Sequence, residues 1–149
     1  MSETAGAAGV GPMSHAIFRV ARLHKSLAGR LLRETGLHPG QELTLMTLWV
    51  DGPQRQVDLA AAIDSDAPTM ARSLARLERD GLVRRTRSDS DRRVVLVEAT
   101  EASLACRPKV EAAWQELERL TVGSLSPQQQ AGIAQDLRLL ESNLEPLDP

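Results

Sequence analysis

The segment VRRTRSDSDRRVVLVEAT, Val83 to Thr100, places a cluster of arginines and aspartates between two short apolar runs. Leu82–Arg87 and Arg93–Glu98 have the composition of strands, and Ser88–Arg92 between them has the composition of a turn. The segment therefore predicts a two-stranded hairpin with a charged tip. Such a tip is either a solvated turn or a projection that contacts an anionic partner.

Two short helices joined by a polar turn are predicted immediately before this hairpin. Gln56–Ile63 forms the first helix, and Asp64–Asp66 supplies capping residues for the second, at about Ala67–Asp80. Pro68 falls in the first turn of that second helix, where its missing N–H is harmless. Gly81 ends the helix in the left-handed conformation. The order predicts a helix-turn-helix followed by a β-ribbon.

The second helix of this pair has two different faces. Its apolar residues recur at helical spacing and are expected in the core: Met70, Leu74 and Leu77. A polar stripe occupies the opposite face: Thr69, Arg72, Ser73, Arg76 and Arg79. Arginine can bridge the two acceptors of guanine, and hydroxyl groups can meet phosphates or base edges, so the stripe suits the major groove of DNA.

The hairpin tip carries Arg92 and Arg93, and arginine is favoured by the negative potential of a narrow minor groove. Asp89 and Asp91 would repel phosphates if they faced DNA. They are therefore expected to turn inward and hold an arginine side chain or the N–H groups of the turn. Solvation alone explains a single exposed arginine, but the consecutive order of helix pair, stripe and basic hairpin favours DNA binding.

Composition restricts the other classes of function. The 149-residue chain is long enough for one domain, and its net charge of −2 hides a segment, Thr69–Arg93, with 8 arginines against 4 acids. A single cysteine excludes a disulfide framework, and no apolar run is long enough for a membrane span. The opening residues lack the pattern of a secretory signal, so a cytoplasmic location is expected. Since the sequence contains no motif for catalysis, metal binding or cofactor binding, we expect that the protein is not an enzyme and binds neither a metal nor a cofactor.

Amphipathic helices are predicted on both sides of the central motif. Residues 13–34 carry an apolar face at helical spacing, and a second helix is expected around Leu43–Trp49. Residues 101–121 have a coiled-coil-like seam, with Pro108 marking either a kink or a short turn before the main helix. Ser126-Pro127-Gln128-Gln129 predicts a capping box for a last helix. Residues 1–12 are predicted to be a flexible Gly/Ala arm.

Gln56 to Thr100 resembles the winged helix-turn-helix core of the MarR family of bacterial transcriptional regulators. The family's wing signature corresponds to Asp91-Arg92-Arg93, five residues, then Ala99-Thr100, where Ala99 replaces the usual leucine. LERDGLVRR, Leu77 to Arg85, resembles the end of the recognition helix and the entry to the wing. The implied fold is mainly α with a small β-hairpin wing: a winged helix-turn-helix with N- and C-terminal dimerisation helices.

The resemblance assigns roles along the chain. Residues 13–149 would form a single domain, with 13–36 and 101–149 as dimerisation helices and 37–100 as the winged helix-turn-helix. Asp91 would brace the wing. The residues expected to contact DNA are Pro68, Thr69, Arg72, Ser73, Arg76, Arg92 and Arg93.

The expected function is regulation of transcription by a homodimeric repressor, bound to double-stranded DNA at a pseudo-palindromic operator. A twofold pair would place two recognition helices about 34 Å apart, one turn of the duplex. The family further implies release by a phenolic or aromatic acid, with a cleft lined by His15, Arg19, Met46 and Trp49, although Met46 and Trp49 also suit an ordinary core. The alternative is a helical protein–protein adaptor that kept this fold and lost DNA binding.

Overall fold

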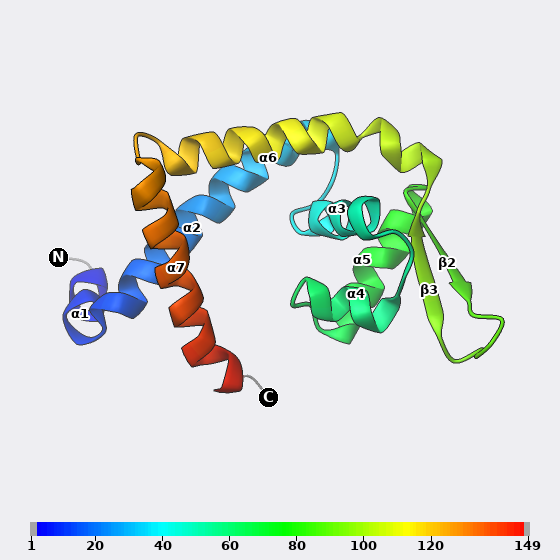
Figure 1. Ribbon diagram of the computed structural model, residues 1–149, viewed down its shortest axis with the longest axis horizontal. Helices are drawn as coiled ribbons and strands as arrows, with labels where there is room; N and C mark the ends of the chain where they lie inside the picture. The colour runs from blue at the N-terminus through cyan, green and yellow to red at the C-terminus, as the bar shows by residue number, and fades with distance from the viewer. Residues whose placement is uncertain (1–2, 148–149) are drawn as a thin grey trace.

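The computed structural model describes residues 3–147, and the side chains of residues 6–147. The helices are α1 (Glu3–Val10), α2 (Pro12–Leu32), α3 (Gln41–Asp51), α4 (Gln56–Ala62), α5 (Ala67–Arg79), α6 (Arg107–Val122) and α7 (Pro127–Leu144). The strands are β1 (Gln54–Arg55), β2 (Val83–Arg87) and β3 (Val95–Ala99), and short 3₁₀ helices occupy Arg33–Thr35, Glu101–Ala105 and Glu145–Leu147. Figure 1 shows α3–α5 and the sheet gathered on one side, with α1, α2 and α7 extending away from them.

A single hydrophobic core joins α3, α4, α5 and the sheet. Its fully buried members come from all of these elements: Leu45, Leu48, Leu59, Met70, Leu74, Leu77, Val83 and Val97. Val110 extends this core into α6. The three residues expected to bury the inner face of α5 all do so, which leaves the opposite face of that helix in solvent.

The sheet has three strands in the order β1-β3-β2, so the prediction of a two-stranded hairpin was incomplete. The short strand β1 pairs antiparallel with β3, Gln54 opposite Val97 and Arg55 opposite Leu96. Only two residues of β1 take part, which is too short for a periodic sequence signal. β1 ties the start of α4 to the wing.

The wing turn is longer than predicted. The expected second strand begins at Arg93, but β3 begins at Val95. The Ser88 N–H donates to the Val94 carbonyl at 2.9 Å, and the Val94 N–H donates to the Asp91 carbonyl at 3.0 Å. These bonds fold Asp91–Val94 into a tight turn, so Arg93 belongs to the loop and not to the strand.

The predicted flexible arm is also corrected, because Glu3–Val10 is helical. Alanine has the highest intrinsic helix propensity, and residues 5, 7 and 8 are alanine. The Gly11 N–H donates to the Ala7 carbonyl at 2.9 Å, which extends the helical pattern to the start of α2.

The terminal helices follow their predicted capping signals. A 3₁₀ turn at Glu101–Ala105 precedes α6, and Pro108 lies in the first turn of α6, so of the two alternatives the short turn is the one observed. Ser126 and Gln129 form the predicted capping box at the start of α7. α6 packs along α2, whereas α7 buries none of its residues. Among residues 3–147, no helix combines the length and apolar character needed to cross a membrane.

Candidate nucleic-acid interface

The start of α5 is held by a single aspartate. Asp66 accepts hydrogen bonds from the Thr69 N–H at 2.7 Å and from the Thr69 hydroxyl at 2.9 Å. The N–H bond, the hydroxyl bond and the nearby Arg72 charge together lower the pKa of Asp66. The cap satisfies a free N–H at the helix end, where a negative charge is also favoured by the helix dipole. Gly81, at φ 75°, ends the helix after Asp80 in the left-handed conformation.

The outer face of α5 carries the predicted polar stripe. Arg72, Arg76 and Arg79 are exposed and form no ion pair within residues 6–147. Thr69 is exposed like its neighbour Pro68, but its hydroxyl donates to Asp66 and accepts a weak bond from Arg72 at 3.4 Å. The Thr69 hydroxyl thus has a capping contact that the sequence pattern did not indicate.

A groove of about 410 Å³ runs along this face. Its walls come from the loop before α3, from the turn between α4 and α5, and from α5 itself, whose contribution includes Thr69, Arg72, Ser73 and Arg76. The structure therefore brings most of the predicted major-groove residues together on one open surface.

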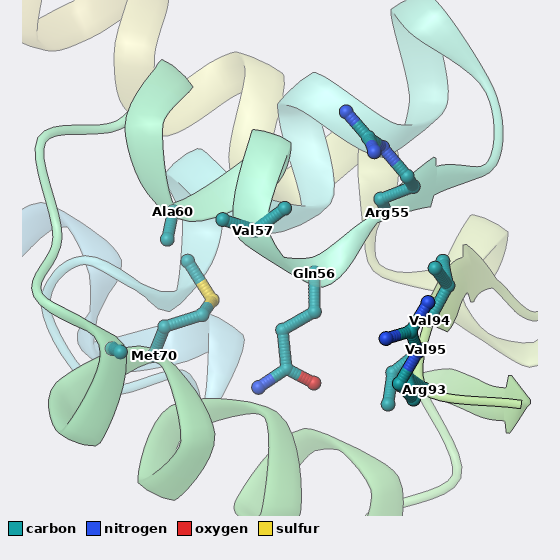
Figure 2. A pocket seen from close by; sticks show the side chains of 9 residues that line it. Arg55, Gln56, Val57, Ala60, Met70, Arg93, Val94 and Val95 are labelled. Atoms are coloured by element: carbon teal, nitrogen blue, oxygen red, sulfur yellow. The ribbon is translucent and has the colours of Figure 1, made fainter.

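The wing lies next to the first half of α5. Met70 of α5 and Arg93 of the wing line one cavity, together with Gln56 and Val57 of α4 (Figure 2). The wing loop therefore lies beside the helix-turn-helix.

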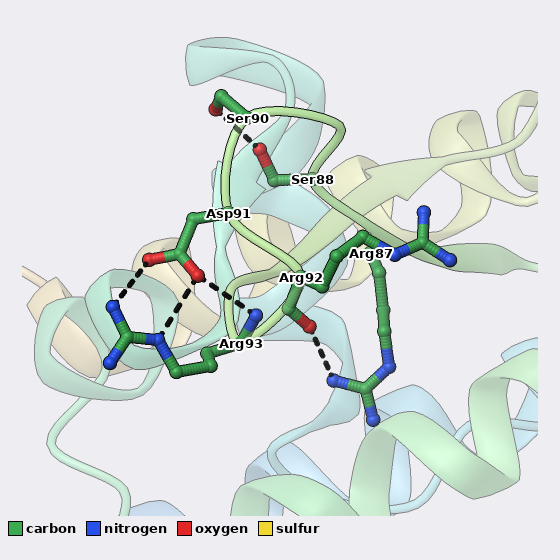
Figure 3. A network of polar contacts seen from close by, with 6 residues as sticks. All are labelled: Arg87, Ser88, Ser90, Asp91, Arg92 and Arg93. Carbon is green, nitrogen blue, oxygen red and sulfur yellow. Dashed lines mark hydrogen bonds and ion pairs between the residues drawn. The ribbon is translucent and has the colours of Figure 1, made fainter.

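Asp91 organises the wing loop through Arg93 (Figure 3). Its Oδ1 accepts from the Arg93 backbone N–H at 3.0 Å and from Arg93 Nε at 3.2 Å, and its Oδ2 accepts from Nη2 at 3.3 Å. The side-chain and backbone hydrogen bonds of Arg93 lower the pKa of Asp91. Asp91 thus turns its charge toward its own loop, while the Arg93 side chain is still 92% exposed. The same expectation was wrong for Asp89, whose side chain is exposed and has no hydrogen-bond partner within residues 6–147.

Arg87 gives the loop a second support. Its Nη1 donates to the Arg92 carbonyl at 2.8 Å, and across the loop the Ser88 and Ser90 hydroxyls are 2.9 Å apart (Figure 3). The Arg92 side chain itself is exposed and has no hydrogen-bond or ion-pair partner in residues 6–147. The sequence pattern did not reveal the role of Arg87, because its partner is a backbone carbonyl five positions along the chain.

Asp64 and Asp66 line the groove itself, whereas two further carboxylates, on α5 and β3, are paired with strand arginines. Arg84 contacts Glu98 at 2.6 Å across the sheet, and Arg85 contacts Glu78 at 3.1 Å. Bonds from the Arg85 side chain and backbone lower the pKa of Glu78. These pairs neutralise acids that would otherwise oppose an anionic partner.

A chain of hydrogen bonds joins the residue after α5 to the 3₁₀ turn before α6 and to α3. The Thr100 hydroxyl donates to the Gly81 carbonyl at 2.6 Å, and the Ser103 hydroxyl donates to the Thr100 carbonyl at 2.6 Å. Trp49 Nε1 donates to the Ser103 hydroxyl at 2.9 Å. Thr100 stands where the wing rejoins the core, next to Ala99. The junction is thus fastened by polar bonds that sequence reasoning missed.

The four predicted ligand residues lie on two separate elements. His15 and Arg19 belong to α2, which packs on α1 and α6. Met46 and Trp49 belong to α3 and pack against the hydrophobic core. Arg107 lies over the Trp49 ring, 5.7 Å from its centroid. The Trp49 ring thus donates its N–H to Ser103 and has Arg107 over its face, as expected of a residue that packs against the core.

Comparison with known proteins agrees with this geometry. Residues 37–95 match the model of the MarR family. YwoH of Bacillus subtilis (strain 168), an uncharacterized HTH-type transcriptional regulator, is 33% identical over 88 residues. The match covers 59% of this chain and 64% of the length of YwoH.

Two solved structures share nearly the whole fold. BpsR of Bordetella bronchiseptica, whose DNA binding is regulated by 6-hydroxynicotinic acid, has a TM-score of 0.80 at 24% identity. The matched region covers 87% of this chain and 98% of the BpsR chain. A cysteine-to-serine mutant of E. coli MarR, complexed with operator DNA, has a TM-score of 0.77 at 23% identity. The matched region covers 96% of this chain and 98% of the MarR chain. Residues 37–95, which hold the helix-turn-helix and most of the wing, are therefore similar to the MarR family, and the chain shares its overall fold with these solved structures.

Proposed function

We propose that this protein is a sequence-specific DNA-binding regulator of transcription that represses as a homodimer. The observation that carries the proposal is the state of the arginines of α5. Arg72, Arg76 and Arg79 are exposed and free of carboxylate partners within residues 6–147, beside a wing in which Asp91 and Glu98 are paired with arginines of the wing itself. The related MarR of E. coli is complexed with operator DNA on the same fold.

In this proposal α5 enters the major groove. Arg72 and Arg76 reach base edges, where a two-pronged contact to guanine discriminates between bases. Pro68, Thr69 and Ser73 lie at the helix start or along the same stripe and approach the phosphates, which the N-terminus of a helix attracts.

The wing supplies the second contact. Arg93 enters the neighbouring minor groove, with Arg92 beside it on the backbone or in the same groove. Asp91 braces the wing through its three bonds to Arg93. Bracing matters because a preordered arginine loses less conformational freedom on binding.

The homodimer is proposed from the terminal helices. Apolar side chains remain exposed along them: Ile17, Phe18, Val20 and Leu23 on α2, and Ile133, Leu137, Leu139 and Leu144 on α7. An apolar surface of this extent is typical of an interaction site. Twofold pairing through these helices would present two copies of α5 to successive turns of a pseudo-palindromic operator.

Release by a small aromatic acid is a further part of the proposal. The DNA binding of the related BpsR is regulated by 6-hydroxynicotinic acid. His15 and Arg19 of one element and Met46 and Trp49 of another would contact such a ligand. The ligand would act by favouring a dimer conformation in which the spacing of the recognition helices does not match the operator. It can do so only if its affinity for that conformation is higher than its affinity for the DNA-binding one.

A salt titration tests DNA binding most directly. Fluorescence anisotropy with labelled DNA from upstream of the protein's own gene should show affinity falling steeply as salt rises, because binding releases counterions from the phosphates. Scrambled DNA of equal length is the control for sequence choice. A helical adaptor that has lost DNA binding would show little affinity at any salt concentration, and that result would overturn the proposal.

A further inference from the structure

The helix α5 carries one acidic residue, Glu78, which lies between Arg76 and Arg79 in the sequence. A carboxylate at this place repels phosphates, so it opposes the binding of DNA by the neighbouring arginines. Glu78 does not neutralise either of them, because its partner is Arg85 of β2. The contact therefore joins α5 to the wing, the two elements that are proposed to enter neighbouring grooves.

Glu78 binds Arg85 through both of its carboxylate oxygens. Oε2 accepts from the Arg85 backbone N–H at 3.1 Å, and Oε1 accepts from Arg85 Nη2 at 3.1 Å. An exposed ion pair gains little, in part because two flexible side chains must be ordered. The backbone N–H is already ordered as part of the strand, so this bond restrains the course of β2 itself.

Packing anchors only the base of the wing. Val83 and Val97 are buried in the core, and the Thr100 hydroxyl donates to the Gly81 carbonyl. Farther out, cavities of about 400 and 300 Å³ separate the wing from α4 and α5, and Figure 2 shows the smaller one. Glu78 and Arg85 both line the larger cavity, so their contact spans a gap that apolar side chains do not fill.

We propose that Glu78 is a positioning residue that fixes the angle between α5 and the wing, and so the placement of Arg93 relative to Arg76. Glu78 itself does not contact DNA. A wing that is free to swing would present Arg93 correctly for only part of the time, and the apparent affinity for DNA falls by that fraction. The effect on DNA rests on the proposed function, whereas the restraint on the wing does not.

The DNA test compares Glu78→Gln with Glu98→Gln, which breaks the Arg84 pair within the sheet. Each variant removes one acid beside the proposed DNA surface, so charge alone predicts tighter binding for both. Positioning predicts instead that Glu78→Gln binds an operator with A·T-rich flanks about tenfold more weakly, and that Glu98→Gln shows no loss. Fluorescence anisotropy gives these affinities.

A double variant identifies the residue through which Glu78 acts. In an Arg93→Ala background, Glu78→Gln should cause no further loss of affinity, because the contact that it positions is already gone. A general disturbance of the fold would instead lower the affinity in both backgrounds.

Hydrogen exchange measured by NMR tests the restraint without DNA. The Arg85 N–H should exchange about tenfold faster in Glu78→Gln than in the wild type, and at the wild-type rate in Glu98→Gln. The amide of Leu74, in the buried face of α5, should stay protected in both variants, which shows that the fold is kept.

The inference is overturned if Arg85 exchanges at the same rate in both variants, if Glu78→Gln binds the operator as tightly as Glu98→Gln, or if its loss persists in the Arg93→Ala background. A wild-type protein that binds no DNA would refute regulation alone. The exchange rates would then still decide whether Glu78 restrains the wing.

Discussion

The arginines of the winged helix-turn-helix fall into three groups with different environments. Arg84 and Arg85 pair with acids of the sheet and of α5, and Arg87 supports the backbone of the wing loop. Arg72 and Arg76 have no carboxylate partner within residues 6–147. Arginines of the same segment therefore differ in their environments, and a local count of positive charge does not identify the ones that we propose to contact DNA.

Arg76 is the residue whose loss should affect sequence choice most. Arg76→Ala is expected to cost roughly 1–3 kcal/mol of operator binding and to relax discrimination at one base pair, because a two-pronged contact is removed. Competition binding with single-base operator variants measures both effects. Arg119→Ala is the control, since Arg119 is an exposed arginine of α6 that is paired with Glu116. Equal losses in the two variants would contradict the assignment.

Arg93 should act on the flanks of the operator. Arg93→Ala is expected to weaken binding mainly where the flanking sequence is A·T-rich, because the narrow minor groove of such DNA has the most negative potential. The measurement compares dissociation constants for operators with A·T-rich and G·C-rich flanks. A loss of the same size on both would show that Arg93 contacts only the phosphates.

At the scale of the element, α5 depends on its two ends. Asp66 caps its first turn, and the left-handed Gly81 ends it within bonding distance of Thr100. The buried face of Met70, Leu74 and Leu77 fixes the rotation of the helix about its own axis. The outward direction of the stripe follows from that burial.

The cap makes the stability of the domain sensitive to acid. Hydrogen bonds to Thr69 lower the folded-state pKa of Asp66 below its usual value of about 3.9, so its contribution is complete above that value. The contribution is lost as the pH falls through the lowered folded pKa. Asp66→Ala should therefore lower the melting temperature at about pH 7, and the difference from wild type should shrink below about pH 3.

Circular dichroism melts at several pH values measure this effect. Asp89→Ala is the control, because Asp89 is exposed on the wing loop and makes no hydrogen bond within the described residues. A difference between Asp66→Ala and wild type that stays constant into acid would contradict the capping role of the charge.

The junction after the wing gives a second prediction at this scale. Thr100→Val removes a hydroxyl that donates to the Gly81 carbonyl and accepts from the Ser103 N–H at 3.3 Å, so both groups lose a partner. The free energy of unfolding should fall by about 1 kcal/mol. Urea denaturation measures it, and Thr100→Ser, which keeps the hydroxyl, should recover most of the loss. If valine and serine are equally stable, the bond contributes nothing.

At the scale of the whole molecule, the terminal helices present more apolar surface than the chain itself covers. α7 has no buried residue, and much of the apolar side of α2 is exposed. The core of the winged helix-turn-helix, in contrast, is complete within one chain. This difference places the proposed dimer surface at one end of the molecule, away from the wing (Figure 1).

The dimer is therefore expected to be separable from the fold. A double variant, Ile133→Glu with Leu137→Glu, should convert a dimer to a folded monomer at micromolar concentration, since it places charges in an apolar interface. Analytical ultracentrifugation gives the mass, and circular dichroism gives the helix content. Val50→Glu is the control at an exposed apolar position of α3. A wild-type protein that is monomeric at micromolar concentration would refute the dimer.

The sequence by itself determined the order of the helices after residue 12, the caps at Asp66 and Ser126, the stop at Gly81 and the charged loop of the wing. Each of these features depends on residues within a turn or two of one another. Because the interactions are local, the spacing of residues in the sequence predicts them. The family resemblance rested on the same local features, together with the order in which they occur.

Tertiary structure alone decided the pairing of β1 with β3, the bond between Thr100 and Gly81, and the division of the arginines into paired and free. The Arg84–Glu98 pair joins residues fourteen positions apart that face each other only because of the strand register. Contacts of this kind form when distant segments pack together, and no periodicity along the chain encodes them. The cavity between the helix-turn-helix and the wing loop exists for the same reason, because its walls come from α4, α5 and the wing loop.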